Sequence, residues 1–130
     1  MTQQTATQRA ETAPAARREP RVLAIIINWN KKDWLDRVLE AVQKLERPPD
    51  EILVVDNASS DGSAEMVSGK HPRAHLLRQK ENLGGSGGFN AGLRWGLERG
   101  GFNYFWLLDN DVILHPERVP NEQMGLIFEN

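Results

Sequence analysis

The sequence predicts an α/β fold with a doubly wound, mostly parallel β-sheet flanked by helices. Two observations predict it. Short apolar, β-branched runs alternate with amphipathic segments, and polar or glycine-rich residues follow each apolar run. The 130 residues suffice for one such domain and are too few for two. Ligands of these sheets bind outside the carboxyl ends of the strands, so the residues after each strand are the candidate site.

The composition excludes several classes of protein. With 16 Lys and Arg against 18 Asp and Glu, the formal net charge of -2 argues against nucleic-acid binding driven by overall charge. Without cysteine, the chain has no disulfide, thiolate metal site or cysteine nucleophile. Its longest apolar run is far shorter than the roughly 20 residues that cross a bilayer, and no signal peptide is visible. We therefore expect a cytoplasmic domain without a transmembrane segment.

The first half of the chain is predicted to contain a leader, two strands and two helices. Residues 1–20 have no large apolar residue after Met1 and are expected to form a disordered leader. Residues 21–28 and 51–57 are continuous apolar runs typical of strands buried on both faces. The first helix, stopped by Pro48 and Pro49, has an apolar stripe of Leu35, Val38, Leu39, Val42 and Leu45. The second lies within residues 59–70, with Gly69 as its stop.

The second half is predicted to add two strands, a glycine-rich loop and one helix. Residues 74–79 and 103–111 are the strands, the second of which turns from apolar to acidic at its end. The helix begins at Phe89, and Phe89, Leu93 and Leu97 recur at a spacing of four. Because Pro120 interrupts any helix in residues 119–130, we expect an irregular tail there. The predicted domain therefore spans residues 21–118, and its sheet is truncated after the fourth strand.

Asp109 and Asp111 are candidate metal ligands. They lie two residues apart at a strand end, so an extended backbone points both carboxylates the same way. Two such charges repel unless a cation lies near them, and Mg²⁺ or Mn²⁺ prefers carboxylate oxygens together with substrate phosphates. The alternative is a plain polar loop in which these side chains cap the next segment.

Asp56, Asn28, Trp29 and Asn30 also follow predicted strands. Asp56 has the location of an acid that accepts hydrogen bonds from a ribose, or it forms an Asx-type turn. Trp29 can stack on a nucleobase or pack against the protein, and Asn30 can cap the following helix. The histidines, His71, His75 and His115, show no metal-ligand spacing and are expected on the surface.

The stretch "KENLGGSGGFNAG" (residues 80–92) fails both familiar phosphate-loop patterns. Asn90 stands where G-x-G-x-x-G needs its last glycine, and Leu93 follows Gly92 where a Walker motif needs lysine. A linker is a poor interpretation because a helix starts at once. We expect a loop whose backbone comes close to a ligand, with the neutral amides of Asn82 and Asn90 beside it.

The ordered set of strand ends resembles the N-terminal, donor-binding half of family 2 glycosyltransferases with the GT-A fold. The resemblance covers about residues 21–116 and is carried by "IIINWNKKDWLDRVLEAV", "ILVVDNASSDGS", "ENLGGSGGFNAGL" and "WLLDNDVIL". It implies that Asn28, Trp29 and Asn30 line a nucleobase pocket and that Asp56 contacts the base or ribose. It further implies a wall along the nucleotide sugar made by Asn82, Gly84, Gly88 and Asn90. Asp109 and Asp111 would bind the divalent cation and the diphosphate.

The resemblance also implies an activity, which is inverting transfer of a sugar from a nucleoside diphosphate to a hydroxyl of a glycan or lipid-linked acceptor. The doubled glycines and "DND" look most like members that use dTDP-rhamnose or UDP-galactofuranose. The family's general base and most acceptor contacts come from a C-terminal half, so the base is expected beyond Asn130 and this chain alone is expected to transfer weakly or not at all. The alternative is a non-catalytic nucleotide-sugar-binding module. The resemblance places the protein in the cytoplasm or peripherally at the inner face of the membrane, in cell-wall or polysaccharide biosynthesis.

Overall fold

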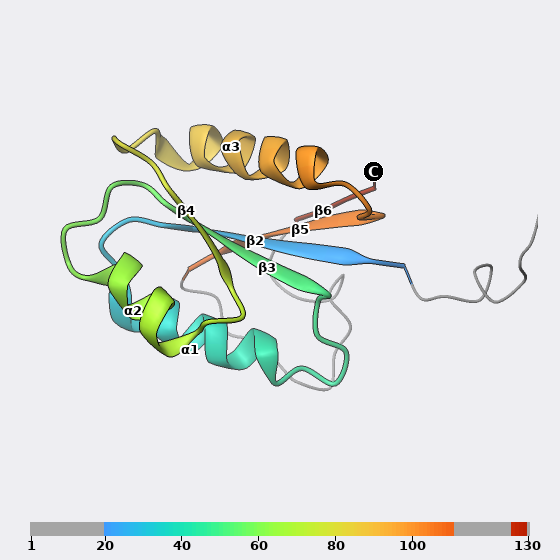
Figure 1. The fold of residues 1–130 in the computed structure, drawn as a ribbon, viewed down its shortest axis with the longest axis horizontal. Helices are drawn as coiled ribbons and strands as arrows, with labels where there is room; N and C mark the ends of the chain where they lie inside the picture. Colours follow the sequence, from blue (N-terminus) through green and yellow to red (C-terminus); the bar gives the residue numbers. More distant parts are fainter. Residues whose placement is uncertain (1–19, 111–125, 130) are drawn as a thin grey trace, which may run out of the picture.

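The protein is a five-stranded sheet between two layers of helices. The structure, a computed structural model, describes residues 20–110 and 126–129. The elements run in the order β2 (Val22–Asn28), α1 (Lys32–Gln43), β3 (Glu51–Asp56), α2 (Ser63–Lys70), β4 (His75–Arg78), α3 (Gly84–Arg99), β5 (Tyr104–Asp109) and β6 (Leu126–Glu129). The strand order across the sheet is β4-β3-β2-β5-β6 (Figure 1). The four strands β2 to β5 are parallel, which confirms the predicted doubly wound fold.

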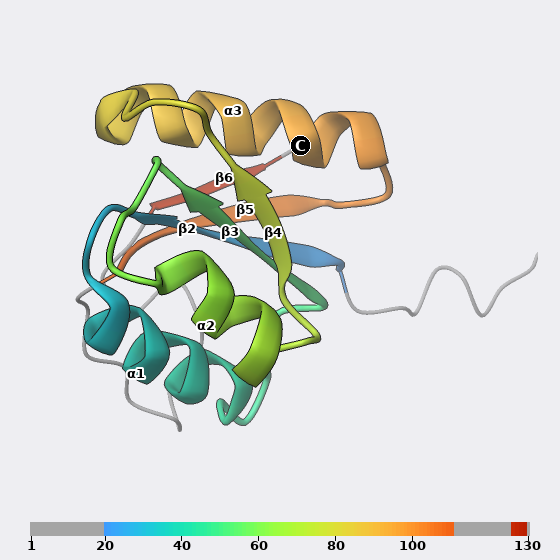
Figure 2. The same ribbon diagram turned by 60° about the vertical axis from the view of Figure 1, so that its left-hand side comes forward.

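Successive residues of the central strands face opposite helix layers, because side chains alternate across a strand. On β2, Ala24 and Ile26 pack in the core under α1 and α2, whereas Leu23 and Ile25 pack in the core under α3. Figure 2 shows α1 and α2 together on one face of the sheet and α3 alone on the other. Burial on both faces explains why this strand is an uninterrupted apolar run in the sequence.

Helix α1 buries the predicted stripe, but both early helices end differently from the prediction. Leu35, Val38, Leu39 and Val42 are buried, as is Leu45 just beyond the end of α1. Helix α2 begins at Ser63 after Gly62, which has a φ of 88°. Gly69, predicted to stop α2, lies inside the helix, and His71 takes the C-cap position.

Helix α3 begins at Gly84, five residues earlier than predicted, so the glycines form its first turns rather than a loop. Its buried face is Gly88, Gly92 and Gly96, while Leu97 of the predicted stripe is 56% exposed. A Cβ at Gly92 would lie 2.6 Å from Cγ2 of Ile25, so the missing side chains let the helix axis approach the sheet. Glycine has low helix propensity, and tertiary packing overrides it here.

The sheet does not end at β5. Strand β6 pairs antiparallel with β5, from Tyr104 opposite Glu129 to Leu107 opposite Leu126. The irregular tail expected for residues 119–130 is therefore wrong for its last part. The physical reason is that an uncovered β5 would present unpaired backbone groups, which a short apolar strand satisfies. Residues 1–19, predicted to be disordered, and residues 111–125 lie outside the described part of the chain.

Candidate functional site at the carboxyl edge of the sheet

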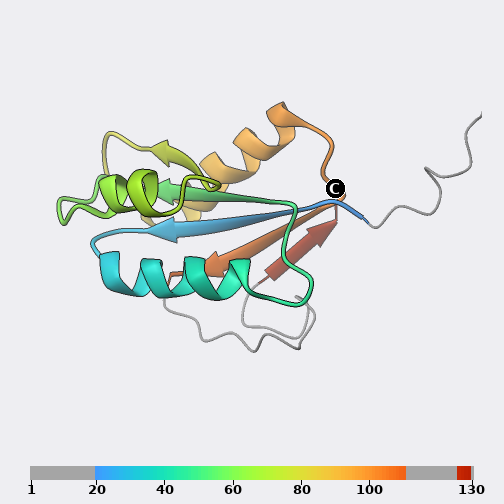
Figure 3. The same cartoon turned by 60° about the horizontal axis from the view of Figure 1, so that its bottom comes forward.

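The carboxyl ends of the parallel strands bring the predicted site residues to one edge. The register pairs Asn28 with Asp56 across β2 and β3, and Ile27 with Asp109 across β2 and β5. Asp56 is in turn opposite Arg78 of β4. Figure 3 shows the arrowheads of β2 to β5 at the same edge, with β6 running the other way. Asn28 and Asp56 are thus register partners, and Asp109, the partner of the residue before Asn28, lies at the same edge although it is 81 positions from Asn28 in the sequence (109 - 28).

Asn28 is fully buried and lies at the centre of a hydrogen-bond network. Its Nδ2 donates to Asp56 Oδ1 at 3.0 Å and to Ser59 Oγ at 3.1 Å. Its Oδ1 accepts from Asn110 Nδ2 at 2.8 Å. The resemblance implied that Asn28 lines a nucleobase pocket; its side chain is fully buried in this network, and contact with a nucleobase stays a prediction.

Asp56 is 1% exposed and serves as an acceptor within its own turn. Its Oδ2 accepts from the Ser59 backbone N–H at 3.0 Å, and its Oδ1 accepts from the Ser59 hydroxyl at 2.7 Å as well as from Asn28. The structure therefore gives Asp56 the Asx-type turn that the sequence left open beside a ribose contact. Contact with a ribose or base stays a prediction.

Trp29 and Asn30 follow Asn28 and differ in exposure. Trp29 is 52% exposed, so its ring is accessible to a planar ligand. Asn30 has a φ of 52°, and its Oδ1 accepts from the Ser60 backbone N–H at 2.7 Å. It does not cap α1, whose N-cap residue is Lys31 without a side-chain cap bond.

Asp61 binds the start of α1 from the other side of the site. Its Oδ2 accepts from the Lys32 backbone N–H at 3.0 Å, and its Oδ1 accepts from the backbone N–H of Ser63 at the same distance. Burial works to raise the pKa of the Asp61 carboxyl, but the hydrogen bonds from Ser63 and Lys32 outweigh it and lower this pKa. A single carboxylate thus ties together the beginnings of α1 and α2.

The glycine-rich segment forms the far wall of the edge. Asn82 Oδ1 accepts from the Gly84 backbone N–H at 2.8 Å, and Gly84 has a φ of 74° that favours glycine. Gly88 is buried, and a Cβ there would lie 3.2 Å from Asn57 Nδ2. Asn90 is exposed on α3. The sheet and Asn57 thus explain the glycine at position 88, and close approach of this segment to a ligand stays a prediction.

Asn57 is a residue at this edge that sequence reasoning missed. It is 1% exposed, and its Nδ2 donates to the Gly84 carbonyl at 3.1 Å. Its Oδ1 has no hydrogen-bond partner among the described residues. Its position directly after Asp56 was the available signal, but only the fold shows that it joins β3 to the start of α3.

Asp109 lies exposed at the end of β5. No hydrogen bond or ion pair involves its carboxylate within the described part of the chain, so its oxygens are open to a cation. Asn110 follows it and is held by Asn28. Asp111, the second predicted metal ligand, lies outside the described residues.

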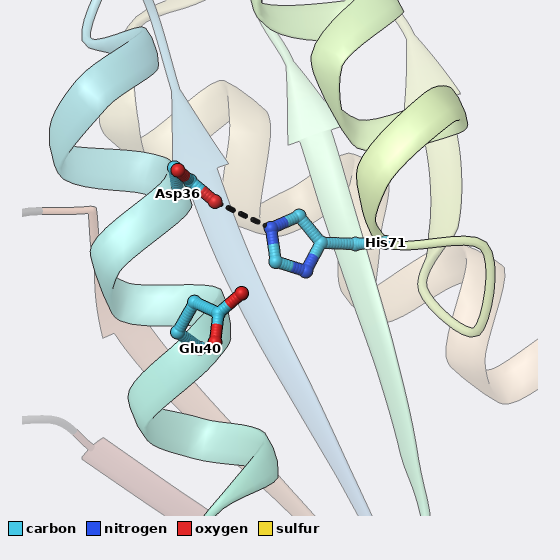
Figure 4. Close-up of side chains that lie close together, drawn as sticks. All are labelled: Asp36, Glu40 and His71. Carbon is cyan, nitrogen blue, oxygen red and sulfur yellow. Dashed lines mark hydrogen bonds and ion pairs between the residues drawn. The ribbon is translucent and has the colours of Figure 1, made fainter.

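A second group with metal-ligand chemistry lies between α1 and the end of α2. Carboxylate oxygens of Asp36 and Glu40 and a ring nitrogen of His71 all lie within 4.8 Å of one another (Figure 4). His71 is 3% exposed, so its prediction as a surface residue was wrong. The reason is that the α1–α2 contact covers it, which the sequence does not show.

Hydrogen bonds already engage Asp36 and His71 of this group. Gln43 Nε2 lies 2.9 Å from the Leu39 carbonyl and 3.0 Å from His71 Nδ1, so the amide donates to both. His71 Nδ1 is therefore the acceptor, and its Nε2–H donates to Asp36 at 2.7 Å. Burial opposes ionisation of Asp36, but bonds from Lys70 and His71 outweigh it and lower its pKa. The Asp36 carboxylate is thus already paired with Lys70 and His71.

The opposite, amino edge of the sheet carries an ion-pair cluster around Glu51. The Glu51 carboxylate accepts from Arg99 Nε at 2.7 Å, His75 Nε2 at 2.8 Å and Arg21 Nη2 at 2.9 Å. His75 packs against Trp95 with 34% of its side chain exposed, so it lies at the surface, as predicted, with one side covered. His115 lies outside the described residues. The cluster joins the starts of β2, β3 and β4 to the end of α3, so it serves the fold.

Within the described residues, no helix is both long enough and apolar enough to cross a membrane.

Comparison with known proteins points to one family. Residues 23–124 match the family described as Glycosyl transferase family 2. The galactofuranosyltransferase GlfT1 of Mycolicibacterium smegmatis is 34% identical over 90 residues, which cover 69% of this chain and 30% of GlfT1. The undecaprenyl-phosphate mannosyltransferase of Micrococcus luteus is 36% identical over 103 residues, which cover 77% of this chain and 42% of that protein.

A solved structure agrees with these matches. The mannosyltransferase PcManGT from Pyrobaculum calidifontis, in complex with GDP-Man and Mn²⁺, has a TM-score of 0.63 and 26% identity. The match covers 75% of this chain and 29% of PcManGT. The predicted GT-A fold is thereby confirmed. The chain spans less than half the length of each of these three relatives.

Proposed function

Because this chain belongs to glycosyl transferase family 2, we propose that it forms the donor-binding half of a metal-dependent, inverting glycosyltransferase. The observation that supports the proposal is that Asn28, Asp56 and Asp109 all lie at the carboxyl edge of the parallel strands. That edge is where doubly wound sheets bind nucleotides. The donor is a nucleoside diphosphate sugar, and the acceptor hydroxyl belongs to a glycan or a lipid-linked glycan.

The exposed groups at this edge suit different parts of such a donor. The ring of Trp29, 52% exposed, is available to stack on the base. The first turn of α3 presents backbone N–H groups, of which that of Gly84 is bonded to Asn82, and the following ones suit phosphate or sugar oxygens. Asn30, Asn82 and Asn90 offer neutral amides, and Gly84 leaves this wall open, whereas Gly88 lets the start of α3 lie close to the sheet. Asn28 and Asp56 hold the turn that supports the pocket.

The cation is Mg²⁺ or Mn²⁺, bound by Asp109 and Asp111. The donor set fits a hard divalent ion, because the carboxylate of Asp109 is exposed and unpartnered within the described residues. A bound cation would offset the charge that grows on the leaving nucleoside diphosphate. The Mn²⁺ in the PcManGT complex supports this choice.

We propose dTDP-rhamnose or UDP-galactofuranose as the donor type. The 34% identity to a galactofuranosyltransferase supports the second of these. The similarity to a mannosyltransferase solved with GDP-Man makes a GDP-sugar the competitor that the experiment must include. A second candidate function is a module that binds nucleotide sugars without turnover.

The test is isothermal titration of the chain with UDP, dTDP and GDP, each with and without Mn²⁺. We expect binding of at least one diphosphate to require Mn²⁺, and Asp109→Ala to abolish that requirement together with most of the affinity. Absence of binding to all three diphosphates in Mn²⁺, or binding of NADH without metal, would contradict the proposal. A donor-hydrolysis and sugar-transfer assay on the same preparation separates the enzyme from the binding module, since only the enzyme turns over.

A further inference from the structure

We propose that Asn28 and Asn110 form a positioning link that couples the turn after β3 to the cation-binding end of β5. The inference rests on the proposed function, because it concerns how the same edge holds its cation. Neither residue touches the donor in this interpretation. Asn28 acts through Asn110, and Asn110 acts by holding the backbone that carries Asp109.

The first step is that the orientation of the Asn28 amide is determined by its neighbours. The carboxylate of Asp56 only accepts hydrogen bonds here, from Ser59 and from Asn28, so the group 3.0 Å from its Oδ1 must be the NH₂ of Asn28. The opposite end of the amide, Oδ1, then points its lone pairs at Asn110. The bonds in the Asp56 turn therefore leave the Asn28 Oδ1 as an acceptor, to which Asn110 donates.

The second step is that the link is buried where it begins and reaches the exposed end of β5. Asn28 is fully buried and Asn110 is half-buried, whereas Asp109 beside it is exposed. A buried amide oxygen that loses its donor carries a desolvation cost, so the Asn28–Asn110 bond strongly favours a single position of residue 110. In the described residues, this is the side-chain hydrogen bond that joins the segment after β5 to the rest of the edge.

The third step is the consequence for the cation. The carboxylate of Asp109 has no protein partner among the described residues, so its position depends on its backbone. A cation site loses affinity when its ligands must be ordered on binding, because the ordering entropy is subtracted from the binding free energy. Breaking the link therefore weakens cation binding while it leaves the contacts to the nucleoside in place.

The chain offers a matched control at the other end of the same strand. Asn103 precedes β5 as Asn110 follows it, and its Oδ1 accepts from the backbone N–H of Arg21 at 2.8 Å. Asn103→Ala thus removes one asparagine hydrogen bond between the starts of β5 and β2, at the edge of the sheet opposite the site. Asn110→Ala removes its counterpart at the site.

The experiment titrates Mn²⁺ into each variant at a constant concentration of the diphosphate (UDP, dTDP or GDP) that binds the wild type most tightly. Loss of one hydrogen bond to an otherwise buried group is expected to raise the Mn²⁺ concentration for half-maximal diphosphate binding about 3- to 10-fold in Asn110→Ala. Asn103→Ala is expected to leave it unchanged. Affinity for the corresponding nucleoside without metal is expected to be the same in wild type and both variants.

A double-mutant cycle with Asn28→Ser tests whether Asn110 acts through Asn28. If it does, the double variant shifts the Mn²⁺ midpoint no further than the more severe single variant, because the link is already broken. Additive shifts would overturn the inference, as would a midpoint in Asn110→Ala that equals that of Asn103→Ala. Should Asn28→Ser fail to fold by circular dichroism, the comparison of Asn110→Ala with Asn103→Ala still decides.

If the wild type itself binds no diphosphate with Mn²⁺, the proposed function and this inference fail together. If the wild type binds and Asn110→Ala matches it, only the inference fails.

Discussion

Replacing Gly92 by alanine tests whether the glycine face of α3 exists to let the helix approach the sheet. Gly92 has an ordinary helical backbone, so alanine meets no conformational strain there. Its Cβ would lie 2.6 Å from Ile25 Cγ2 and 3.2 Å from Val55 Cγ2. Carbon atoms pack best at about 3.5–4.0 Å, so the helix or the Ile25 side chain must move by roughly 1 Å.

Two opposing effects set the size of the change. Alanine is about 1 kcal/mol more favourable than glycine inside a helix, whereas forcing a methyl group into a packed core costs about 1–3 kcal/mol. The Ile25 methyl is attached to Cβ of a central strand, so it yields little, and the steric cost prevails. We expect Gly92→Ala to lower the free energy of unfolding by up to about 2 kcal/mol.

Gly85→Ala is the matched control in the same helix. A Cβ at Gly85 would meet nothing within 4 Å, so only the propensity gain remains. We expect Gly85→Ala to raise the free energy of unfolding by about 0.5–1 kcal/mol. Urea unfolding followed by circular dichroism measures both. Equal stabilisation by the two substitutions would refute the close-approach explanation.

Two further predictions concern the opposite edge and the nucleobase. Burial acts to raise the pKa of Glu51, but the hydrogen bonds from Arg99 and His75 outweigh it and hold this pKa below its ordinary value of 4.5. The ionised carboxylate therefore contributes its full stabilisation of the fold above pH 4.5, and this contribution is lost as the pH falls through the lowered pKa. Glu51→Gln should therefore lower the free energy of unfolding by about 1 kcal/mol at pH 7 and by less below pH 4.5. If urea unfolding shows the same loss of stability across this pH range, the ion-pair explanation is wrong. Trp29→Ala should weaken nucleoside diphosphate binding about tenfold by titration calorimetry, because base–aromatic stacking contributes about 1–3 kcal/mol, and should leave the melting temperature unchanged. Unaltered affinity would remove Trp29 from the pocket.

Much of the fold could be predicted because the central strands are local signals. The runs 22–28, 51–56 and 104–109 are apolar without interruption, and such runs between amphipathic segments have few arrangements other than a parallel, doubly wound sheet. From that topology alone, the residues after each strand had to meet at one edge. The sequence alone therefore predicts that Asn28, Asp56 and Asp109 gather at this edge.

The role of each residue at that edge depended on contacts between segments distant in the chain. Whether Asn28 faces a ligand or Asp56 and Asn110, whether α3 begins at Gly84 or Phe89, and whether His71 is exposed or bonded to Asp36 are decided by packing across α1, α2 and the sheet. A run of glycines in the sequence does not distinguish a loop from a helix packed closely against a sheet. An asparagine likewise can line a ligand pocket or belong to a buried hydrogen-bond network, and the sequence does not distinguish the two. Sequence periodicity predicts which residues are apolar and face the core. The extent of burial and the hydrogen-bond partners of each side chain are determined only by the packing of the helix layers against the sheet.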